Sequence, residues 1–318
     1  MQLLFIIKKA VIKFFVIIDY LKQLTQYTCR IVIRRKLANV RVLNTEDSID
    51  YIIRNRCSLS RYGDGEFSMA WQYITGKRYM NESYFQQYDK ELGKRLAEIL
   101  QQTNFDNTKH AVGISYSYYN GLRGLVFDAR RYLMYFINSH HSLLLSSINI
   151  DRLYLNSELT RFYITRKDKK RSRKVIQQMS KIWEGRNICF IEGEKSRLGI
   201  GNDLFENVKS VKRILCPAEG AYDKYNEIIN KAKEQPKDTL FLLALGMTAT
   251  VMAYDLSLYG LQAVDLGHVD IEYEWMRMGV KQKVPVPNKY TNEVEGGKQP
   301  GNIVNTIYET QIIARIGC

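Results

Sequence analysis

The sequence predicts an α/β fold that is Rossmann-like, with a mostly parallel sheet flanked by helices. In the C-terminal half, short apolar runs alternate with segments of helical character, which is the order typical of βαβ units. Several of these runs end in glycine, and ligands in such folds bind at the carboxyl ends of the strands. Hydrophobic residues make up 45% of the 318 residues and charged residues 25%, a globular composition that excludes a disordered or coiled-coil chain.

The C-terminal half has the clearest pattern. Its apolar runs predict four strands, and the segments between them predict two helices, the second of which ends at Gly260. We expect the strands at residues 187–193, 211–216, 239–246 and 262–267, and the helices at residues 222–233 and 247–259.

The N-terminal half is less regular. Strands are expected at residues 57–62 and 111–116, and helices after Phe67 and at residues 89–102. Boundaries predicted from such patterns are accurate to a few residues.

The positive charge is concentrated in two stretches. The net charge is +14, and residues 1–36 hold eight basic residues and one acid, while residues 161–187 hold ten basic residues and two acids. The rest of the chain is close to neutral and carries no recognised nucleic-acid motif, so we expect no nucleic-acid partner. The second stretch is either a solvated face or a surface that attracts a phosphate-rich or lipid-linked substrate.

The N-terminal segment, residues 1–40, is expected to be distinct from a domain at residues 41–318. Lys8, Lys9 and Lys13 interrupt its apolar residues, which argues against both a spanning helix and a secretory signal. The pattern suits a basic amphipathic helix on an anionic membrane surface, and it also suits a helix packed on the body or on a partner chain. We therefore expect peripheral membrane association through residues 1–36 as one of two alternatives.

The five cysteines are scattered and form no CxxC pair. A disulfide scaffold and a structural zinc site therefore have little support, and a reducing compartment fits better. We expect a cytoplasmic protein, located at the inner face of the cell membrane if the N-terminal segment binds lipid.

The first motif with chemical potential is SLSRYGDGEF, residues 58–67. If this stretch is extended, Asp64 and Glu66 point the same way and could hold a hard divalent cation with open positions for phosphate oxygens. Gly63 and Gly65 would let the backbone approach a ligand, and Arg61 could bind a phosphate. The alternative is an ordinary Asp-Gly turn.

The second motif is EGEKSRLGIGNDLF, residues 192–205, which follows a predicted strand. If a helix starts at Asn202 or Asp203, its first amides together with Gly199 and Gly201 would form an anion cradle. Arg197 lies in the same segment as a further candidate for nucleotide binding. The motif lacks the third glycine of the dinucleotide fingerprint, and a glycine-rich turn is the alternative.

The third motif is LGHVDIEYEW, residues 266–275, directly after the last predicted strand. In an extended chain, one face would carry four titratable side chains, which would repel one another unless a cation, a basic partner or shared protons relieved them. This pattern favours an active site. The four candidates are His268, Asp270, Glu272 and Glu274.

A weaker fourth motif is GMTATVMAYDLSLYG, residues 246–260. Thr248 could contact a phosphate or ribose at a strand–helix junction. A buried helix packed on the sheet explains residues 251–256 equally well.

Taken together, these motifs resemble those of the GT-D-type glycosyltransferases of bacterial surface and adhesin glycosylation. RYGDGEF, EGEKSRLGIGNDLF, the Gly-x-Thr-Ala-Thr segment and GHVDIEYEW occur in the family's order, over about residues 45–295. The resemblance implies a Rossmann-like fold, a nucleotide-diphosphate sugar donor such as UDP-glucose, and Mn²⁺ or Mg²⁺ held through the Asp-x-Glu motif. One departure is Met247, where the family has proline.

The resulting hypothesis is a metal-dependent glycosyltransferase that moves a hexose to a glycan, lipid-linked or glycoprotein acceptor, with inversion. Asp64 and Glu66 would hold the metal, and Glu272 or Glu274, then Asp270, would act as the base, with His268 orienting a partner or contacting the donor. The resemblance also assigns either Arg161 or Arg166 to the donor pyrophosphate or the acceptor. A metal-dependent phosphohydrolase of nucleotide sugars or lipid phosphates is the alternative enzyme. A non-enzymatic basic adaptor is the third and weakest hypothesis.

Overall fold

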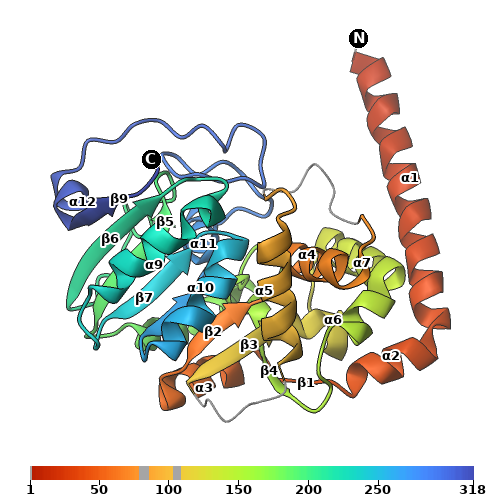
Figure 1. Ribbon diagram of the computed structural model, residues 1–318. Coiled ribbons are helices and arrows are strands. Elements are labelled where there is room, and N and C mark those ends of the chain that lie inside the picture. The colour runs from red at the N-terminus through yellow and green to blue at the C-terminus, as the bar shows by residue number, and fades with distance from the viewer. Residues whose placement is uncertain (1, 79–85, 103–108) are drawn as a thin grey trace.

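A computed structural model describes residues 2–78, 86–102 and 109–318, and it contains one nine-stranded sheet (Figure 1). The strand order is β1-β4-β3-β2-β8-β7-β5-β6-β9, and every neighbouring pair is parallel. Helices cover both faces of the sheet, as expected for a parallel sheet that must be buried on both sides. The predicted Rossmann-like α/β fold is confirmed.

All six predicted strands are present, to within a few residues. Three more strands, at residues 41–42, 153–156 and 312–315, were not predicted. They are short, the first and the last lie at the edges of the sheet, and none forms a long apolar run. The strands are β1 (Arg41–Val42), β2 (Ser58–Arg61), β3 (His110–Ile114), β4 (Leu153–Asn156), β5 (Asn187–Gly193), β6 (Ser210–Cys216), β7 (Leu240–Ala244), β8 (Gln262–Asp265) and β9 (Ile312–Arg315).

The helices predicted after Phe67 and at residues 89–102, 222–233 and 247–259 are present to within a few residues. The helices are α1 (Gln2–Cys29), α2 (Ile31–Ala38), α3 (Thr45–Asn55), α4 (Asp64–Thr75), α5 (Lys90–Gln101), α6 (Tyr116–Asn120), α7 (Phe127–Ser146), α8 (Lys169–Met179), α9 (Tyr225–Lys233), α10 (Met247–Leu258), α11 (Val269–Met278) and α12 (Thr306–Gln311), with 3₁₀ turns η1 (Ser157–Thr160), η2 (Ser180–Ile182) and η3 (Ala221–Lys224).

The contact between β2 and β8 joins the two halves of the sheet. Leu59 on β2 is in register with Val264 on β8, although the two residues are far apart in the sequence. Because both strands run in the same direction, their carboxyl ends meet at one edge of the sheet. The loops that follow Arg61 and Asp265 therefore face each other, at the place where open α/β sheets bind ligands.

The N-terminal helix α1 lies at the margin of the molecule. Its C-terminal half packs on α7, and its first turns extend beyond the body (Figure 1). Asp19 on α1 forms an ion pair with Arg131 on α7 at 3.1 Å. None of the helices in the described ranges combines the length and the apolar character needed to cross a membrane.

Candidate active site

A cavity of about 1060 Å³ opens at the carboxyl ends of β2 and β8. Its wall combines the first turns of α4 and α7, the segment around η1, the start of α11, and the loop at residues 281–293. Of the residues proposed from the sequence, seven line it: Arg61, Gly63, Asp64, Gly65, Glu66, His268 and Asp270.

Arg61 connects the two central strands at the floor of this cavity. It is the last residue of β2, and its Nη2 lies 3.0 Å from Oδ1 of Asp265, the last residue of β8. Its Nε also donates to the Asp265 carbonyl at 2.8 Å, and its Nη1 donates to Thr160 Oγ1 at 2.7 Å. Gly267 has φ +47°, and a Cβ there would lie 2.0 Å from Arg61 Nη2, so only glycine admits this approach.

Asp64 and Glu66 lie in the first turn of α4, so the predicted extended conformation is wrong. The two side chains nevertheless both line the cavity. Glu66 turns back so that its Oε2 accepts from the Gly63 backbone N–H at 2.9 Å, which caps the helix. Asp64 Oδ2 accepts a hydrogen bond from the Tyr132 hydroxyl.

Negative charge accumulates around Glu66. Burial raises the pKa of Glu66 to about 7, and the charges of Asp265 and Asp64 act in the same direction. A cation would relieve this repulsion, and two carboxylates suit Mg²⁺ or Mn²⁺ that also binds substrate phosphates. Within the described residues, no set of three His, Cys, Asp or Glu side chains forms a complete metal site. The residues fit an ion that takes its remaining ligands from water and substrate.

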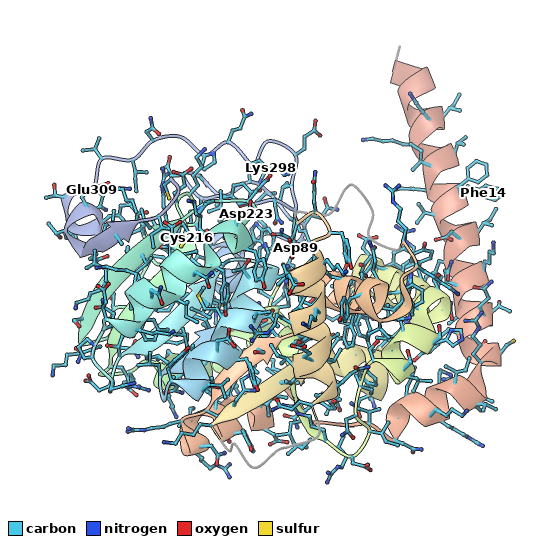
Figure 2. All side chains as sticks on the ribbon, in the orientation of Figure 1. Phe14, Asp89, Cys216, Asp223, Lys298 and Glu309 are labelled. Atoms are coloured by element: carbon cyan, nitrogen blue, oxygen red, sulfur yellow. The ribbon has the colours of Figure 1, made fainter. Side chains whose placement is uncertain are left out.

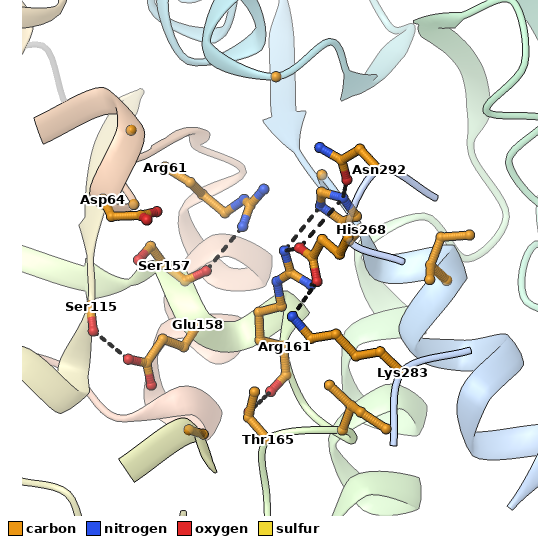
Figure 3. A pocket seen from close by; sticks show the side chains of 18 of the residues that line it. Arg61, Asp64, Ser115, Ser157, Glu158, Arg161, Thr165, His268, Lys283 and Asn292 are labelled. Carbon is orange, nitrogen blue, oxygen red and sulfur yellow. Dashed lines mark hydrogen bonds and ion pairs between the residues drawn. The ribbon is translucent and has the colours of Figure 1, made fainter. Parts of the chain in front are cut away.

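His268 lies on the opposite wall, in a network with the segment after η1 and the loop after α11 (Figure 3). Its Nδ1 lies 3.2 Å from Arg161 Nη2, and its Nε2 lies 3.0 Å from Asn292 Oδ1. These partners assign the proton to Nε2, because arginine only donates. Burial, together with the charge of Arg161, lowers the pKa of His268 to about 4, so the ring is neutral at pH 7.

Glu293 brings two cations together in the same network. It accepts from both Arg161 Nη1, at 3.1 Å, and Arg161 Nη2, and it lies 2.6 Å from Lys283 Nζ. Burial acts to raise the pKa of Glu293, but the charges of Arg161 and Lys283 outweigh it and hold this pKa well below its usual range. Two cations around one carboxylate form a place that an anionic substrate group could also occupy.

The acidic motif at residues 268–275 is helical, so the predicted period-two face is wrong. Glu272 is buried, and its Oε2 accepts from the backbone N–H groups of Tyr163 and Ile164 at 2.9 and 2.8 Å. Burial raises the pKa of Glu272. Neither Glu272 nor Glu274 lines the cavity. Glu272 points to a different side of α11 from Asp270, which does line it, and Glu274 lies one helical turn beyond Asp270. Their positions do not fit a base for a substrate in this cavity.

Asp270 and Glu274, one helical turn apart, bind the glycine-rich segment instead. Asp270 Oδ1 accepts from Gly199 N at 3.0 Å and from Asn202 Nδ2 at 2.7 Å, while Asn202 Nδ2 also lies 2.6 Å from Glu274 Oε1. The remaining Asp270 oxygen pairs with Lys289 at 2.5 Å. Asp270 thus touches the cavity with both oxygens already engaged.

The predicted helix after the glycine-rich segment is also wrong, because residues 194–208 form turns. Without a helix start, the anion cradle proposed there is not formed. None of the nucleotide-binding candidates in this segment lines the cavity, although the neighbouring Ser196 and Leu198 do. These candidates have structural partners: Arg197 donates to the carbonyls of Asn288 and Gly301, Gly201 O accepts from Arg277, and Asp203 accepts from Tyr273.

Thr248 lies in the first turn of α10 and is fully buried outside the cavity lining. In the described part of the chain its hydroxyl has no hydrogen-bond partner. Its neighbour Met247 does line the cavity and packs against Gly65, where an added Cβ would lie 2.5 Å from the Met247 methyl group.

Comparison with known proteins agrees with the location of this cavity. The family described as "Glycosyltransferase GT-D fold" matches residues 59–294. The chain belongs to the GT-D family. The resemblance drawn from the motifs is therefore confirmed, and the matched range contains β2 through the loop that carries Glu293.

Two curated relatives are streptococcal proteins. The chain is 31% identical over 290 residues to "Glycosyltransferase GlyD" of Streptococcus pneumoniae, covering 89% of this chain and 33% of that protein. It is 32% identical over 279 residues to "Probable glycosyl transferase Gly" of Streptococcus gordonii, covering 87% of this chain and 39% of that protein. The chain thus spans between a third and two fifths of the length of these relatives.

Solved GT-D structures match the whole architecture. One is described as a domain of unknown function 1792 with a distinct glycosyltransferase fold; it has a TM-score of 0.81 at 32% identity, with 90% of this chain and 99% of that chain covered. A glycosyltransferase of the same domain family from Streptococcus sanguinis has a TM-score of 0.76 at 31% identity, with 87% of this chain and all of that chain covered.

Several cavity residues of this GT-D chain were not identified from the sequence. Glu158 accepts from Ser117 Oγ at 2.8 Å and from Ser115 Oγ, and it pairs with Arg166 at 2.5 Å. Arg161, in contrast, was one of the two arginines, with Arg166, that the resemblance assigned to the donor pyrophosphate or the acceptor, and only the structure places it in the cavity wall. Glu293 follows the predicted motifs by nearly twenty residues and has no motif of its own.

Proposed function

We propose that this chain is a metal-dependent glycosyltransferase that moves a hexose from a nucleotide-diphosphate donor, such as UDP-glucose, to a glycan, lipid-linked or glycoprotein acceptor, with inversion. Membership of the GT-D family supports the reaction class. The observation that carries the proposal is the cavity itself, which brings the Asp64 and Glu66 carboxylates together with Arg61, Arg161 and Lys283. Carboxylates on one wall and cationic side chains on the other suit a metal-bound diphosphate.

Asp64 and Glu66 are proposed to hold Mn²⁺ or Mg²⁺. A bound ion of this kind supplies neutralisation of the charge that develops on the leaving diphosphate. To bind the ion, Glu66 must lose the proton that its raised pKa favours, and its carboxylate must release the Gly63 N–H. Asp64 needs no such release, but it must exchange its hydrogen bond with Tyr132 or share it.

Arg161 is proposed to bind a donor phosphate, with Lys283 beside it. The neutral ring of His268 accepts from Arg161 and fixes the orientation of the guanidinium group. Arg61 contributes positive charge from the cavity floor, although its side chain is held by Asp265 and Thr160. In this arrangement His268 is a positioning residue.

The base that takes the acceptor proton must be a carboxylate with access to the cavity. Glu272 and Glu274 do not line the cavity and are therefore excluded from this role. We propose Asp128, in the first turn of α7. Asp128 lines the cavity and is exposed. No hydrogen bond or ion pair of Asp128 is found within residues 2–78, 86–102 and 109–318. Glu158, another carboxylate of the cavity wall, is instead already bound by two serines and Arg166.

The test is a thermal-shift panel of UDP, GDP and CMP sugars, each with and without Mn²⁺, followed by turnover assays. We expect one nucleotide class to stabilise the protein in a Mn²⁺-dependent manner. Asp64→Asn and Glu66→Gln should abolish that dependence, and Glu227→Gln on the exposed side of α9 serves as the control. Full metal-dependent activity in both cavity variants would refute the metal site.

Asp128→Asn separates the base from the donor site. It should lower kcat by roughly a hundredfold or more while leaving donor binding unchanged. Phosphate or sugar phosphate released at the same rate without acceptor would instead indicate a phosphohydrolase.

A further inference from the structure

The outer side of α1 carries a continuous apolar stripe. Ile7, Val11, Phe14, Ile18 and Leu21 recur at alternating spacings of four and three residues, which places them on one face of the helix. Each is between 45% and 61% exposed. Figure 2 shows Phe14 pointing away from the body. Exposed residues of this size, arranged in a row, indicate a surface that binds something.

The opposite side of α1 is fixed to the body by α7. Besides the Asp19–Arg131 ion pair, the rings of Tyr20 and Phe127 lie 4.7 Å apart. Asn138 Nδ2 donates to the carbonyl and side-chain oxygens of Gln23, each at 2.9 Å. These contacts set the rotation of the helix, so the apolar stripe cannot turn inward without breaking them.

The charge around the stripe selects its partner. Residues 1–36 carry eight basic residues, and their one acid, Asp19, is already paired with Arg131. Two copies meeting through this face would bring two strongly positive segments together, which is unfavourable. Anionic lipid headgroups would attract the same charge, while the apolar side chains enter the acyl boundary.

We propose that the stripe Ile7–Val11–Phe14–Ile18–Leu21 docks the protein on an anionic membrane surface. In the helical repeat Lys8 lies beside the stripe, and Lys9 and Lys13 lie on the sides away from it. All three add positive charge close to the membrane surface, which attracts anionic headgroups. The helix lies on the membrane and does not span it, in agreement with its content of charged residues.

Docking would also place the cavity beside the lipid. The first turns of α7 contact α1 through Phe127 and Arg131, and they line the cavity through Asp128 and Tyr132. The entrance therefore lies next to the anchored helix. This consequence rests on the proposed function and favours the lipid-linked class of acceptor, whereas the docking itself does not depend on the reaction.

The experiment is flotation of the full chain with phosphatidylcholine vesicles that contain or lack phosphatidylglycerol. We expect binding only to the anionic vesicles. The double variant Phe14→Asp/Ile18→Asp should lower the bound fraction roughly tenfold. The control is Leu258→Asp/Ile307→Asp, which adds the same charge at two exposed apolar positions outside α1 and should bind like the wild type. A Lys8→Gln/Lys9→Gln/Lys13→Gln variant should lose the preference for anionic lipid.

Light scattering and nucleotide thermal shifts complete the design. An unchanged thermal shift with UDP and Mn²⁺ shows that a variant that no longer binds vesicles is still folded. Absence of that shift in the wild type as well points to a failure of the proposed function and leaves the docking to be judged by flotation. Equal flotation of the double variant and the wild type would overturn the docking. So would a dimer that the double variant abolishes, combined with no vesicle binding, since that would assign the stripe to a second copy of the chain.

Discussion

Arg161 and Glu293 form a two-pronged ion pair across the cavity, with Arg161 Nη1 at 3.1 Å from Glu293 Oε2 and a second contact between Nη2 and Oε1. The pair joins the residue after η1 to the loop that follows α11, 132 positions further along the chain. It also neutralises the guanidinium group that we propose for donor binding. A donor phosphate must therefore replace or share the Glu293 carboxylate.

Glu293→Gln should tighten UDP binding. The amide still accepts from Arg161, but it no longer competes with a phosphate as a charge, so we expect a gain of about 1 kcal/mol, roughly fivefold in Kd. Isothermal titration with UDP in the presence of Mn²⁺ measures this. Arg161→Lys, which loses the planar fork, should weaken binding. Weaker binding by Glu293→Gln would show that Glu293 helps to hold the donor rather than competing with it.

Glu66 should make the stability of the metal-free protein depend on pH. Because its pKa is raised from 4.5 to about 7 in the folded state, the folded protein holds this proton more tightly than the unfolded chain. Its contribution to stability is complete below a pH of about 4.5 and is lost as the pH rises through about 7. The free energy of unfolding should therefore fall over this range in the wild type and fall less in Glu66→Gln.

Added Mn²⁺ should reverse this trend. The ion competes with the proton for the carboxylate, so the Mn²⁺-induced rise in Tm should be larger above neutral pH than below it. Denaturant titrations and thermal shifts at matched ionic strength measure both effects. A Mn²⁺ shift that is independent of pH in the wild type would argue against Glu66 as a ligand.

Glu272→Ala should destabilise the fold, and it should also disturb Arg161, because Glu272 Oε1 lies 3.8 Å from Arg161 Nη1. The change leaves the buried N–H groups of Tyr163 and Ile164 without an acceptor, at a cost of about 1–3 kcal/mol each. Urea unfolding measures the loss. Glu272→Gln, which keeps one acceptor oxygen, should recover part of it and retain turnover; a variant that is fully stable yet inactive would restore Glu272 as a catalytic candidate.

Gly267→Ala should remove activity by displacing Arg61. The added Cβ would lie 2.0 Å from Arg61 Nη2, and the positive φ is unfavourable for alanine. We expect weaker donor binding and a lower Tm. Gly76→Ala, at the αL end of α4, shares the positive φ, and a Cβ there would meet no atom of the described residues within 4 Å, so this variant separates backbone strain from displacement. Equal losses in the two variants would mean that strain alone explains the effect.

The sequence alone determined six of the nine strands of the sheet and the pairing of Asp64 with Glu66. Buried strands require continuous apolar runs, and residues 187–193 and 239–246 contain them, so local composition was sufficient. The two acids are separated by one residue, and their shared exposure to the cavity therefore survived the change from a predicted extended segment to a helix.

Only the tertiary structure decided the role of the acidic motif and the members of the second wall. Alternating acids and apolar residues at 268–275 suit an extended chain, but the segment forms α11, which is buried on several sides. Glu272 accepts from the backbone at residues 163–164, whereas Asp270 and Glu274 bind the glycine-rich turns. Likewise, Arg161 meets Glu293 because the β2–β8 contact brings distant loops to one edge of the sheet. Such contacts depend on packing between segments far apart in the chain, which local periodicity does not encode.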